Sequence, residues 1–308
     1  MKILSLDGGG SRGIISLIFL KRLEEIFNVP LNQVFDIFCG CSTGSIIASL
    51  LSQGYKVDEI YRLYKEILPI IFNKKNKTIL GRIGLRPLYK IQPFIEESKK
   101  IFKDIYLRDL EKNLLILAYD TLVDKPLILK SWEDKDNLNI KLWQAVCMSC
   151  CCPTLFPGFK YEIDGVERGI VDGVLVTSNP SLIGISETLS LGYSLEEIKI
   201  ISIGTGDEVI SLNPKKILNK GSIYWGITLP KLLIGSSNEF QSNLSKKLIK
   251  DSFRLQIPVK CLNESIEIDN SIDLYNEEDL IKITYDTERY IKTKEISEIY
   301  EHIKKSFI

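Results

Sequence analysis

The stretch VFDIFCGCSTGSIIASLL, residues 34–51, decides the fold that we expect for this chain. The apolar run at residues 34–39 predicts a buried strand, residues 40–44 predict a sharp glycine-rich turn, and residues 45–51 predict a helix. A strand that enters a helix through a tight turn is typical of a parallel sheet covered by helices. The sequence therefore indicates the α/β class.

The start of the chain repeats this order of elements. Residues 3–6 predict a strand, glycines follow at residues 8–10, and apolar residues recur at helical spacing over residues 14–27. Two successive strand–turn–helix units indicate a three-layer α/β/α fold with a mostly parallel central sheet. We expect one domain, residues 1–308, with a motif-bearing core at about residues 2–185. The remainder is expected to complete the sheet and add C-terminal helices.

The rest of the chain continues these patterns. A helix is expected at residues 57–72, a solvated basic loop at 73–77, and strands at 114–119, 127–129 and 198–204. Beyond residue 210 we expect mainly amphipathic helix with polar loops. An apolar stripe at residues 223–234 favours core packing, and it is also the candidate for an acyl channel or a membrane-facing surface.

Composition excludes several classes of protein. Lys plus Arg equal Asp plus Glu at 40 each, so no basic field is available to hold a nucleic-acid polymer. We find neither a signal peptide nor a stretch of about 20 apolar residues. A soluble, cytoplasmic protein with peripheral membrane contact is expected, and its oligomeric state is left open.

The seven cysteines predict neither a metal site nor disulfides. Residues 150–152 are contiguous cysteines, Cys39 and Cys41 flank one glycine, and the chain has a single histidine, His302. This spacing does not suit a tetrahedral zinc site. We interpret the cysteines, including those in the small-residue run at 147–153, as small buried apolar residues in a reducing compartment.

The turn Gly40-Cys41-Ser42-Thr43-Gly44 fits the G-x-S-x-G nucleophile elbow. A serine at a strained strand-to-helix turn projects its hydroxyl above the sheet, and the following helix dipole favours developing negative charge. The simpler alternative is a glycine-rich turn with a serine N-cap. The strand before it and the helix after it favour Ser42 as a catalytic nucleophile.

The glycine loop at residues 8–13 has two interpretations. Its G-x-G-x-x-G spacing suits a dinucleotide, and Asp36 lies about where a ribose-binding carboxylate would be. Asp36, however, falls within the apolar run instead of at its end. The unhindered N–H groups of such a loop also suit an oxyanion. We favour an oxyanion hole formed by Gly8, Gly9, Gly10 and Arg12, with nucleotide binding as the alternative.

The base that activates the serine is expected to be a carboxylate. His302 lies in a polar terminal helix that we expect to be exposed. Asp-Gly-Val occurs twice, at Asp164 and Asp172. Asp164 falls in an expected hairpin turn, whereas Asp172 ends an apolar strand, where burial raises the pKa of a carboxyl group. Asp172 is therefore the predicted catalytic base.

These three motifs resemble the patatin-like phospholipase family, whose pattern is Asp-Gly-Gly-Gly-x-Arg-Gly, Gly-x-Ser-x-Gly and a later Asp-Gly-Gly/Ala. Residues 7–13, 40–44 and 172–173 match, and the resemblance extends over residues 2–182. It implies a calcium-independent lipid acyl hydrolase or phospholipase A that needs no cofactor. Ser42 would attack a phospholipid or other fatty-acyl ester, and Asp172 would accept its proton. Water would release the acyl-enzyme.

Two departures from the family pattern leave alternatives open. Val174 follows Asp172-Gly173 where glycine or alanine is usual, and Ser178 stands where asparagine is common. The larger Val174 would reshape the loop that aims the aspartate in a non-catalytic, lipid-binding relative. A membrane-degrading effector is a further hypothesis.

Overall fold

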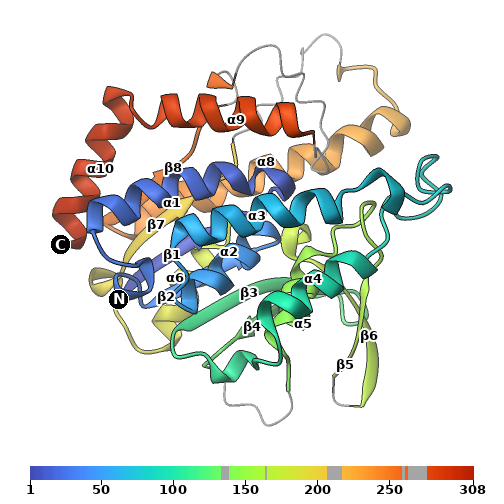
Figure 1. Cartoon of the computed structure of the whole chain (residues 1–308), viewed down its shortest axis with the longest axis horizontal. Coiled ribbons are helices and arrows are strands. Elements are labelled where there is room, and N and C mark those ends of the chain that lie inside the picture. Colours follow the sequence, from blue (N-terminus) through green and yellow to red (C-terminus); the bar gives the residue numbers. More distant parts are fainter. Residues whose placement is uncertain (133–138, 164, 207–216, 259–260, 263–275) are drawn as a thin grey trace.

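The computed structural model describes residues 1–132, 139–163, 165–206, 217–258, 261–262 and 276–308. At its centre lies an eight-stranded sheet with the order β5-β6-β3-β2-β1-β7-β8, in which β4 also pairs with β3. Figure 1 shows helices packed against this sheet. The expected α/β architecture with a mostly parallel sheet is confirmed.

Five strands of the sheet pair in parallel, and three at one side join it through antiparallel pairings. The parallel strands are β1 (Lys2–Leu6), β2 (Ile37–Cys41), β3 (Asn113–Asp120), β7 (Lys199–Ile203) and β8 (Asp251–Leu255). The antiparallel strands are β4 (Lys125–Lys130), β5 (Phe159–Ile163) and β6 (Val166–Asp172). The central strands β1 and β2 are apolar because helices bury both of their faces.

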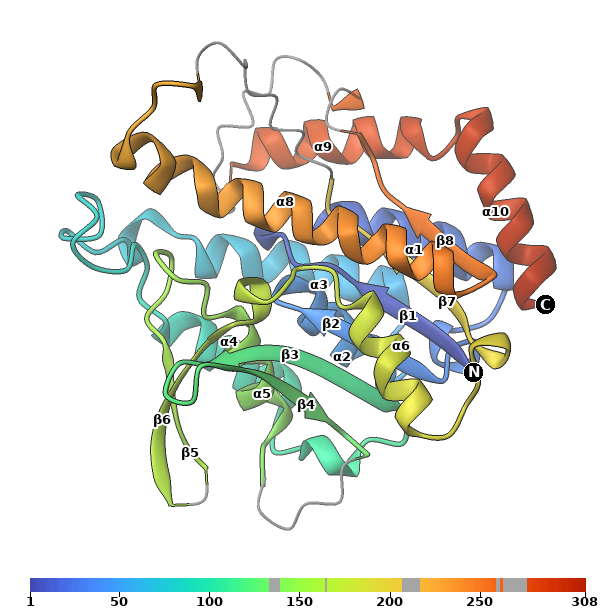
Figure 2. The ribbon, with the colours of Figure 1, turned by 180° about the vertical axis from the view of Figure 1, so that it is seen from behind.

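Helices form a layer on each side of the sheet (Figures 1 and 2). One layer contains α1 (Gly13–Phe27), α2 (Thr43–Ser52), α3 (Val57–Ile71), α4 (Gln92–Phe102), α5 (Leu142–Cys150), α9 (Glu277–Tyr290) and α10 (Lys294–Phe307). The opposite layer contains α6 (Ser181–Ser190) and α8 (Ser222–Leu248). Each layer has its own apolar core, to which successive residues of β1 contribute alternately.

Three local expectations need correction. Strand β2 begins at Ile37 instead of residue 34, because the Val34 and Phe35 N–H groups both donate to the Leu31 carbonyl at 3.0 Å in the preceding turn. Strand β8 falls in a region expected to be mainly helical. On α8, Leu229 and Leu233 are exposed, so this part of the apolar stripe is not in the core.

The described residues contain no helix that is long and apolar enough to cross a bilayer.

Candidate active site

Ser42 occupies the junction of β2 and α2 in a backbone conformation that is rare for a serine. Its φ and ψ angles are 51° and −126°. The glycines on either side permit this turn. A Cβ atom on Gly44 would lie 2.2 Å from the Leu6 carbonyl oxygen, and one on Gly40 would lie 2.5 Å from the Gly44 carbonyl oxygen. Helix α2 therefore packs directly on the strands, and the turn has the geometry expected of a nucleophile elbow.

The backbone of Ser42 is fixed by Ser149, a residue at the end of α5. The Ser42 N–H donates to Ser149 Oγ at 2.9 Å, and the Ser149 hydroxyl donates to the Leu117 carbonyl at 2.6 Å. Sequence reasoning treated the run at 147–153 as packing only. The polar residue Ser149 among these cysteines was the sequence feature that could have indicated this supporting role.

Asp172 lies beside Ser42 because of the register of the sheet. Cys41 on β2 pairs with Leu117 on β3, so one residue further along the chain Ser42 lies level with Ala118. Ala118 in turn pairs with Asp172 at the end of β6. The Ser42 hydroxyl is close enough to the Asp172 carboxylate to influence its pKa. The two residues that the sequence singled out thus lie side by side.

The Asp172 side chain is almost completely buried, at 1% exposure. Burial raises the pKa of Asp172 to about 7, although the nearby Val174 N–H, Ser42 hydroxyl and Cys41 thiol each act to lower it. Desolvation outweighs these donors because it penalises the charged carboxylate directly. A carboxyl group with this pKa can accept a proton near neutral pH.

Val174 orients the carboxylate through its backbone. Its N–H donates to Asp172 Oδ1 at 2.9 Å, a contact that any residue except proline provides. The preceding Gly173 leaves no room for a side chain, since a Cβ atom there would lie 2.4 Å from the Leu117 carbonyl oxygen. The hairpin expected around residue 164 is confirmed by the pairing of β5 with β6. Asp164 itself lies outside the described residues.

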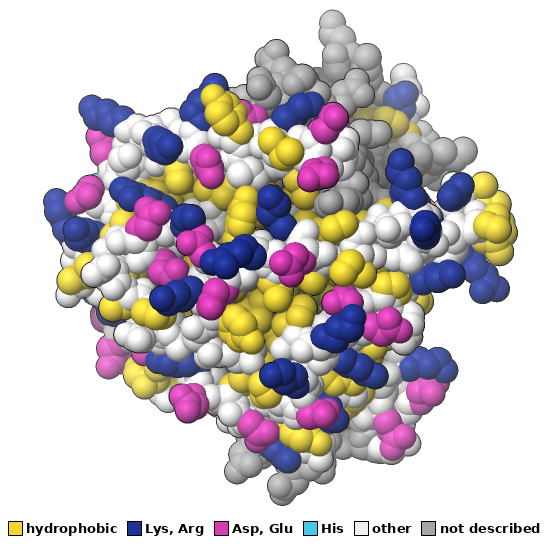
Figure 3. All heavy atoms as spheres, in the orientation of Figure 1, with side chains coloured by type: hydrophobic (Ala, Val, Ile, Leu, Met, Phe, Trp, Pro, Cys, Tyr) yellow, Lys and Arg dark blue, Asp and Glu magenta, His cyan; other side chains and the backbone are white. Residues whose placement is uncertain are grey.

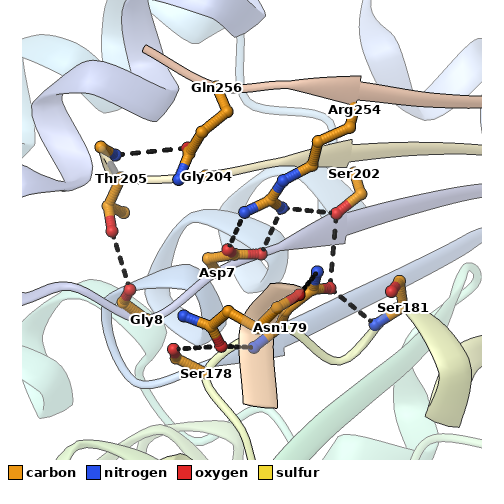
Figure 4. Close-up of polar contacts among 12 residues, drawn as sticks. Asp7, Gly8, Ser178, Asn179, Ser181, Ser202, Gly204, Thr205, Arg254 and Gln256 are labelled. Atoms are coloured by element: carbon orange, nitrogen blue, oxygen red, sulfur yellow. Dashed lines mark hydrogen bonds and ion pairs between the residues drawn. The ribbon is translucent and has the colours of Figure 1, made fainter. Parts of the chain in front are cut away.

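The glycine loop after β1 lies directly against Ser42. A Cβ atom on Gly8 would be 3.1 Å from Ser42 Cβ. Gly8 is held on both sides, because its N–H donates to the Ser178 carbonyl at 2.9 Å. Its carbonyl also accepts from the Thr205 hydroxyl at 2.9 Å, as Figure 4 shows. Among the described residues, no hydrogen-bond acceptor engages the N–H groups of Gly9 and Gly10.

Tyr64 on α3 holds the end of this loop. Its buried hydroxyl donates to the Gly10 carbonyl and hydrogen-bonds the Thr43 hydroxyl at 2.7 Å. Gly10 has a φ angle of 57°, in the left-handed region that glycine adopts most readily. Arg12 ends the 3-10 turn that follows, and its N–H donates to the Gly9 carbonyl at 3.2 Å.

A second polar group supports the loop from β8 and α8. The Arg254 guanidinium donates to both carboxylate oxygens of Asp7 (Figure 4). On α8, the Asn238 side-chain oxygen accepts from the Ser178 hydroxyl at 2.7 Å and from the Asn179 N–H at 3.1 Å. Ser178, one of the two departures from the family pattern, is therefore integrated into the support of the loop.

A ribose-binding role for Asp36 and a base role for His302 do not fit this geometry. Asp36 lies at the start of β2 and the glycine loop lies at the end of β1, so these parallel strands place them at opposite edges of the sheet. His302 is exposed, as expected. Its helix α10 ends near the start of β1, where Lys2 Nζ donates to the Phe307 carbonyl at 2.7 Å, again at the edge opposite Ser42.

A narrow apolar cavity of about 50 Å³ opens beside Ser42. Helices α2, α3 and α4 and the segment after α5 form its walls, and its lining includes Ile46, Tyr64, Ile67, Leu68, Ile71, Phe72, Phe94, Leu155 and Phe156. Residues 223–234, the candidate for an acyl channel, do not line this cavity with their described side chains. The helix expected at residues 57–72, to which no functional role was assigned from the sequence, provides the main wall.

The cysteines near the site are packing residues. Cys41, Cys150 and Cys151 are buried, and burial raises the pKa of each thiol well above its usual range. They therefore stay protonated and poorly nucleophilic. In the part of the chain that the structure describes, no group of three or more His, Cys, Asp or Glu side chains could hold a metal ion.

Comparison with known proteins gives a family match over the site. The family model described as patatin-like phospholipase matches residues 4–184. The chain is 28% identical over 219 residues to an Escherichia coli cUMP-AMP-activated phospholipase, covering 67% of this chain and 64% of that protein. It is 25% identical over 299 residues to a Vibrio cholerae cGAMP-activated phospholipase, covering 88% and 82%.

A human calcium-independent phospholipase A2-gamma is 27% identical over 226 residues, which is 67% of this chain and 28% of the human protein. The chain therefore spans less than two thirds of the length of some of these relatives. Among solved structures, VipD from Legionella pneumophila aligns with a TM-score of 0.48 at 13% identity, covering 97% of this chain and 66% of that one.

Proposed function

Because the chain belongs to the patatin-like phospholipase family, we propose that it hydrolyses fatty-acyl esters of phospholipids, with Ser42 as nucleophile and Asp172 as general base. One observation carries the proposal. Ser42, in its strained elbow, lies beside the buried carboxyl group of Asp172, whose pKa is about 7. This pair combines a positioned nucleophile with a base that operates near neutral pH.

The reaction follows from the positions of these groups. Asp172 takes the Ser42 hydroxyl proton as Oγ attacks the ester carbonyl, and the N–H groups of Gly9 and Gly10 stabilise the resulting oxyanion. Gly8 fixes the loop instead, since its N–H is already engaged by Ser178. Asp172 then passes the proton to the leaving alcohol, and water, activated by the same carboxylate, releases the fatty acid from Ser42.

Arg12 has a supporting part in this proposal. It follows directly on the oxyanion donors and, with Gly9, closes the turn that aims them. The narrow apolar cavity receives the acyl chain, while the head group stays outside it. Calcium is not required, because Asp172 supplies the base and backbone N–H groups stabilise the charge.

Fluorophosphonate labelling and hydrolysis of p-nitrophenyl butyrate and phosphatidylglycerol vesicles test the dyad. We expect Ser42→Ala to abolish labelling, Asp172→Asn to lower turnover by at least 10³-fold, and His302→Ala to match the parent protein. Excess EDTA should leave turnover unchanged. A folded parent protein that binds lipid but neither reacts with the probe nor turns over an ester would instead identify the non-catalytic alternative.

We also propose that a cyclic dinucleotide activates this hydrolysis, as the names of two relatives state for those proteins. A second cavity, of about 610 Å³, lies between α1, α3 and the end of α9. Lys21, Arg22 and Lys292 line it together with Glu25 and Glu288, Arg22 pairs with Glu25 at 2.9 Å, and Tyr61 offers a ring on which a base could stack. An activated enzyme of this kind would act as a membrane-degrading effector.

A panel of cyclic dinucleotides, tested for binding by calorimetry on Ser42→Ala and for activation on the parent protein, decides this second proposal. We expect one member to raise turnover at least tenfold and Arg22→Glu with Lys292→Glu to abolish its binding. Activation that persists in this double variant would place the nucleotide elsewhere. Absence of both binding and activation across the panel would rule the proposal out.

A further inference from the structure

The loop that follows α3 is strongly basic in a chain with no net charge. Residues 73–90, here called the basic loop, contain six Lys or Arg side chains, and the sequence has no Asp or Glu from residue 67 to 95. Lys74, Lys75, Arg82, Arg86 and Lys90 are exposed. The balanced composition of the chain thus conceals a local positive field, and the solvated loop expected at residues 73–77 is one part of it.

The end of the basic loop is apolar as well as exposed. Ile79 is 85% exposed, Ile83 67% and Leu85 72%, which places them among the most exposed large apolar side chains that the structure describes. The loop projects from the body of the molecule in Figure 1, and Figure 3 shows apolar side chains at its end flanked by Lys and Arg. Such exposure in a cluster marks an interaction surface.

The loop has a defined conformation. The Thr78 N–H donates to the Leu88 carbonyl at 2.8 Å, and the Thr78 hydroxyl donates to the Pro87 carbonyl at 2.6 Å. Two hydrogen bonds across the end, from Gly84 N–H to the Gly81 carbonyl and from Leu85 N–H to the Leu80 carbonyl, are each 3.0 Å long. The apolar side chains are therefore presented outward by a closed loop instead of collapsing on the body.

The base of the loop is continuous with the wall of the acyl cavity. The Tyr89 ring packs against Phe72 at 5.5 Å and Phe156 at 6.0 Å between ring centres, and both phenylalanines line the cavity. The N–H groups of Leu88 and Tyr89 also bond to the segment that follows α5, at the Thr154 and Leu155 carbonyls. A surface held by this loop would lie next to the cavity that opens at Ser42.

We infer that the basic loop docks this protein onto lipid bilayers that contain anionic phospholipids. Ile79, Ile83 and Leu85 enter the acyl region, while the flanking Lys and Arg side chains contact phosphate and carboxylate head groups. The apolar side chains suit the acyl region of a bilayer, and the basic side chains suit its anionic head groups. The docking itself does not depend on the proposed hydrolysis, although that function explains why the loop adjoins the cavity.

Co-sedimentation with vesicles tests the docking in Ser42→Ala, so that lipid turnover cannot interfere. We expect binding to vesicles of phosphatidylcholine with 30% phosphatidylserine at about 0.15 M salt, and at least tenfold weaker binding to pure phosphatidylcholine. Adding Ile83→Glu with Leu85→Glu should weaken binding at least tenfold. Adding Arg82→Glu with Arg86→Glu should weaken it at least fivefold per residue and reduce its dependence on salt.

Lys305→Glu with Ile308→Glu is the matched control, since Ile308 is 78% exposed at the opposite end of the molecule in Figure 1. This pair should leave binding unchanged. The inference is overturned if Ser42→Ala binds neither kind of vesicle, or if the two loop variants bind as well as the control while retaining its melting temperature. Binding without hydrolysis in the serine-containing protein would count against the proposed function and leave the docking intact.

Discussion

The Arg254 guanidinium and the Asp7 carboxylate form a buried, two-point ion pair, with N···O distances of 2.9 and 2.5 Å. Arg254 also donates to the Ser202 hydroxyl at 2.7 Å. Asp7 directly follows β1 and begins the glycine loop, whereas Arg254 comes from β8, at the other side of β7. The pair therefore anchors the start of the glycine loop, which borders Ser42, to a strand that is distant in the sequence.

Removing one partner of this pair should destabilise the fold. Arg254→Met removes the guanidinium that pairs with the buried Asp7 carboxylate, and breaking a buried ion pair typically costs about 3–5 kcal/mol of unfolding free energy. We expect this loss in urea denaturation, together with a fall in kcat because the glycine loop shifts. Lys21→Met, which breaks the exposed Lys21–Asp58 pair, should cost less than about 1 kcal/mol. Equal losses in the two variants would contradict a special role for Arg254.

Tyr64→Phe isolates the contribution of one hydroxyl group. It leaves the Gly10 carbonyl and the Thr43 hydroxyl without a buried partner, at a cost of about 1–3 kcal/mol. Because Gly10 is one of the two proposed oxyanion donors, we expect kcat to fall about tenfold with little change in KM. Tyr55→Phe, at a partly exposed tyrosine, is the control. A purely structural role would lower stability and leave kcat of the folded fraction unchanged.

The sequence predicted the parts of the site that depend on local pattern. Residues 34–51 carry the strand, turn and helix of the elbow within one short segment, and Asp172 could be chosen because it ends an apolar strand. The supports of the glycine loop could not be found in this way. Tyr64 resembles any apolar position of an amphipathic helix until α3 packs on the loop.

Arg254 was missed for a different reason. Strand β8 is short and polar, with the sequence Asp-Ser-Phe-Arg-Leu, so its periodicity is too weak to separate it from the surrounding helices. Its place beside β7 is a tertiary property. For the exposed residues of the apolar stripe on α8, the prediction of core packing was wrong. An apolar pattern indicates burial only when another element covers it.

The pH dependence of hydrolysis should report the ionisation of Asp172. Only the deprotonated carboxylate can accept the Ser42 proton, and burial raises the pKa of Asp172 to about 7. We therefore expect kcat/KM for p-nitrophenyl butyrate to fall about tenfold for each pH unit below 7 and to level off above it. Circular dichroism at each pH verifies that the protein stays folded. A profile flat between pH 5 and 8 would mean that a different group is the base.

Asp172→Asn should increase stability while it removes activity. The pKa of Asp172 is about 7 in the folded state and 3.8 without burial, so the folded state disfavours the charged form. Below pH 4 the Asp172 carboxyl group is neutral, and the folded state buries it without an electrostatic penalty. This contribution to folding stability is lost as the pH rises through 7. At pH 8 the asparagine variant should gain up to about 4 kcal/mol, and at pH 4 the gain should vanish. Urea denaturation at both pH values measures it.

The walls of the cavity should set the acyl-chain length that the enzyme accepts. Ile71 lines the cavity on α3, and the adjacent Ile70 points away from it with 42% exposure. Ile71→Phe fills space that a long acyl chain must occupy and leaves room at Ser42 for an acetyl group. We expect kcat/KM for p-nitrophenyl decanoate to fall at least tenfold relative to p-nitrophenyl acetate. Ile70→Phe, the same change one residue earlier, should leave this ratio unchanged. If both variants shift the ratio equally, or neither does, the acyl chain binds outside this cavity.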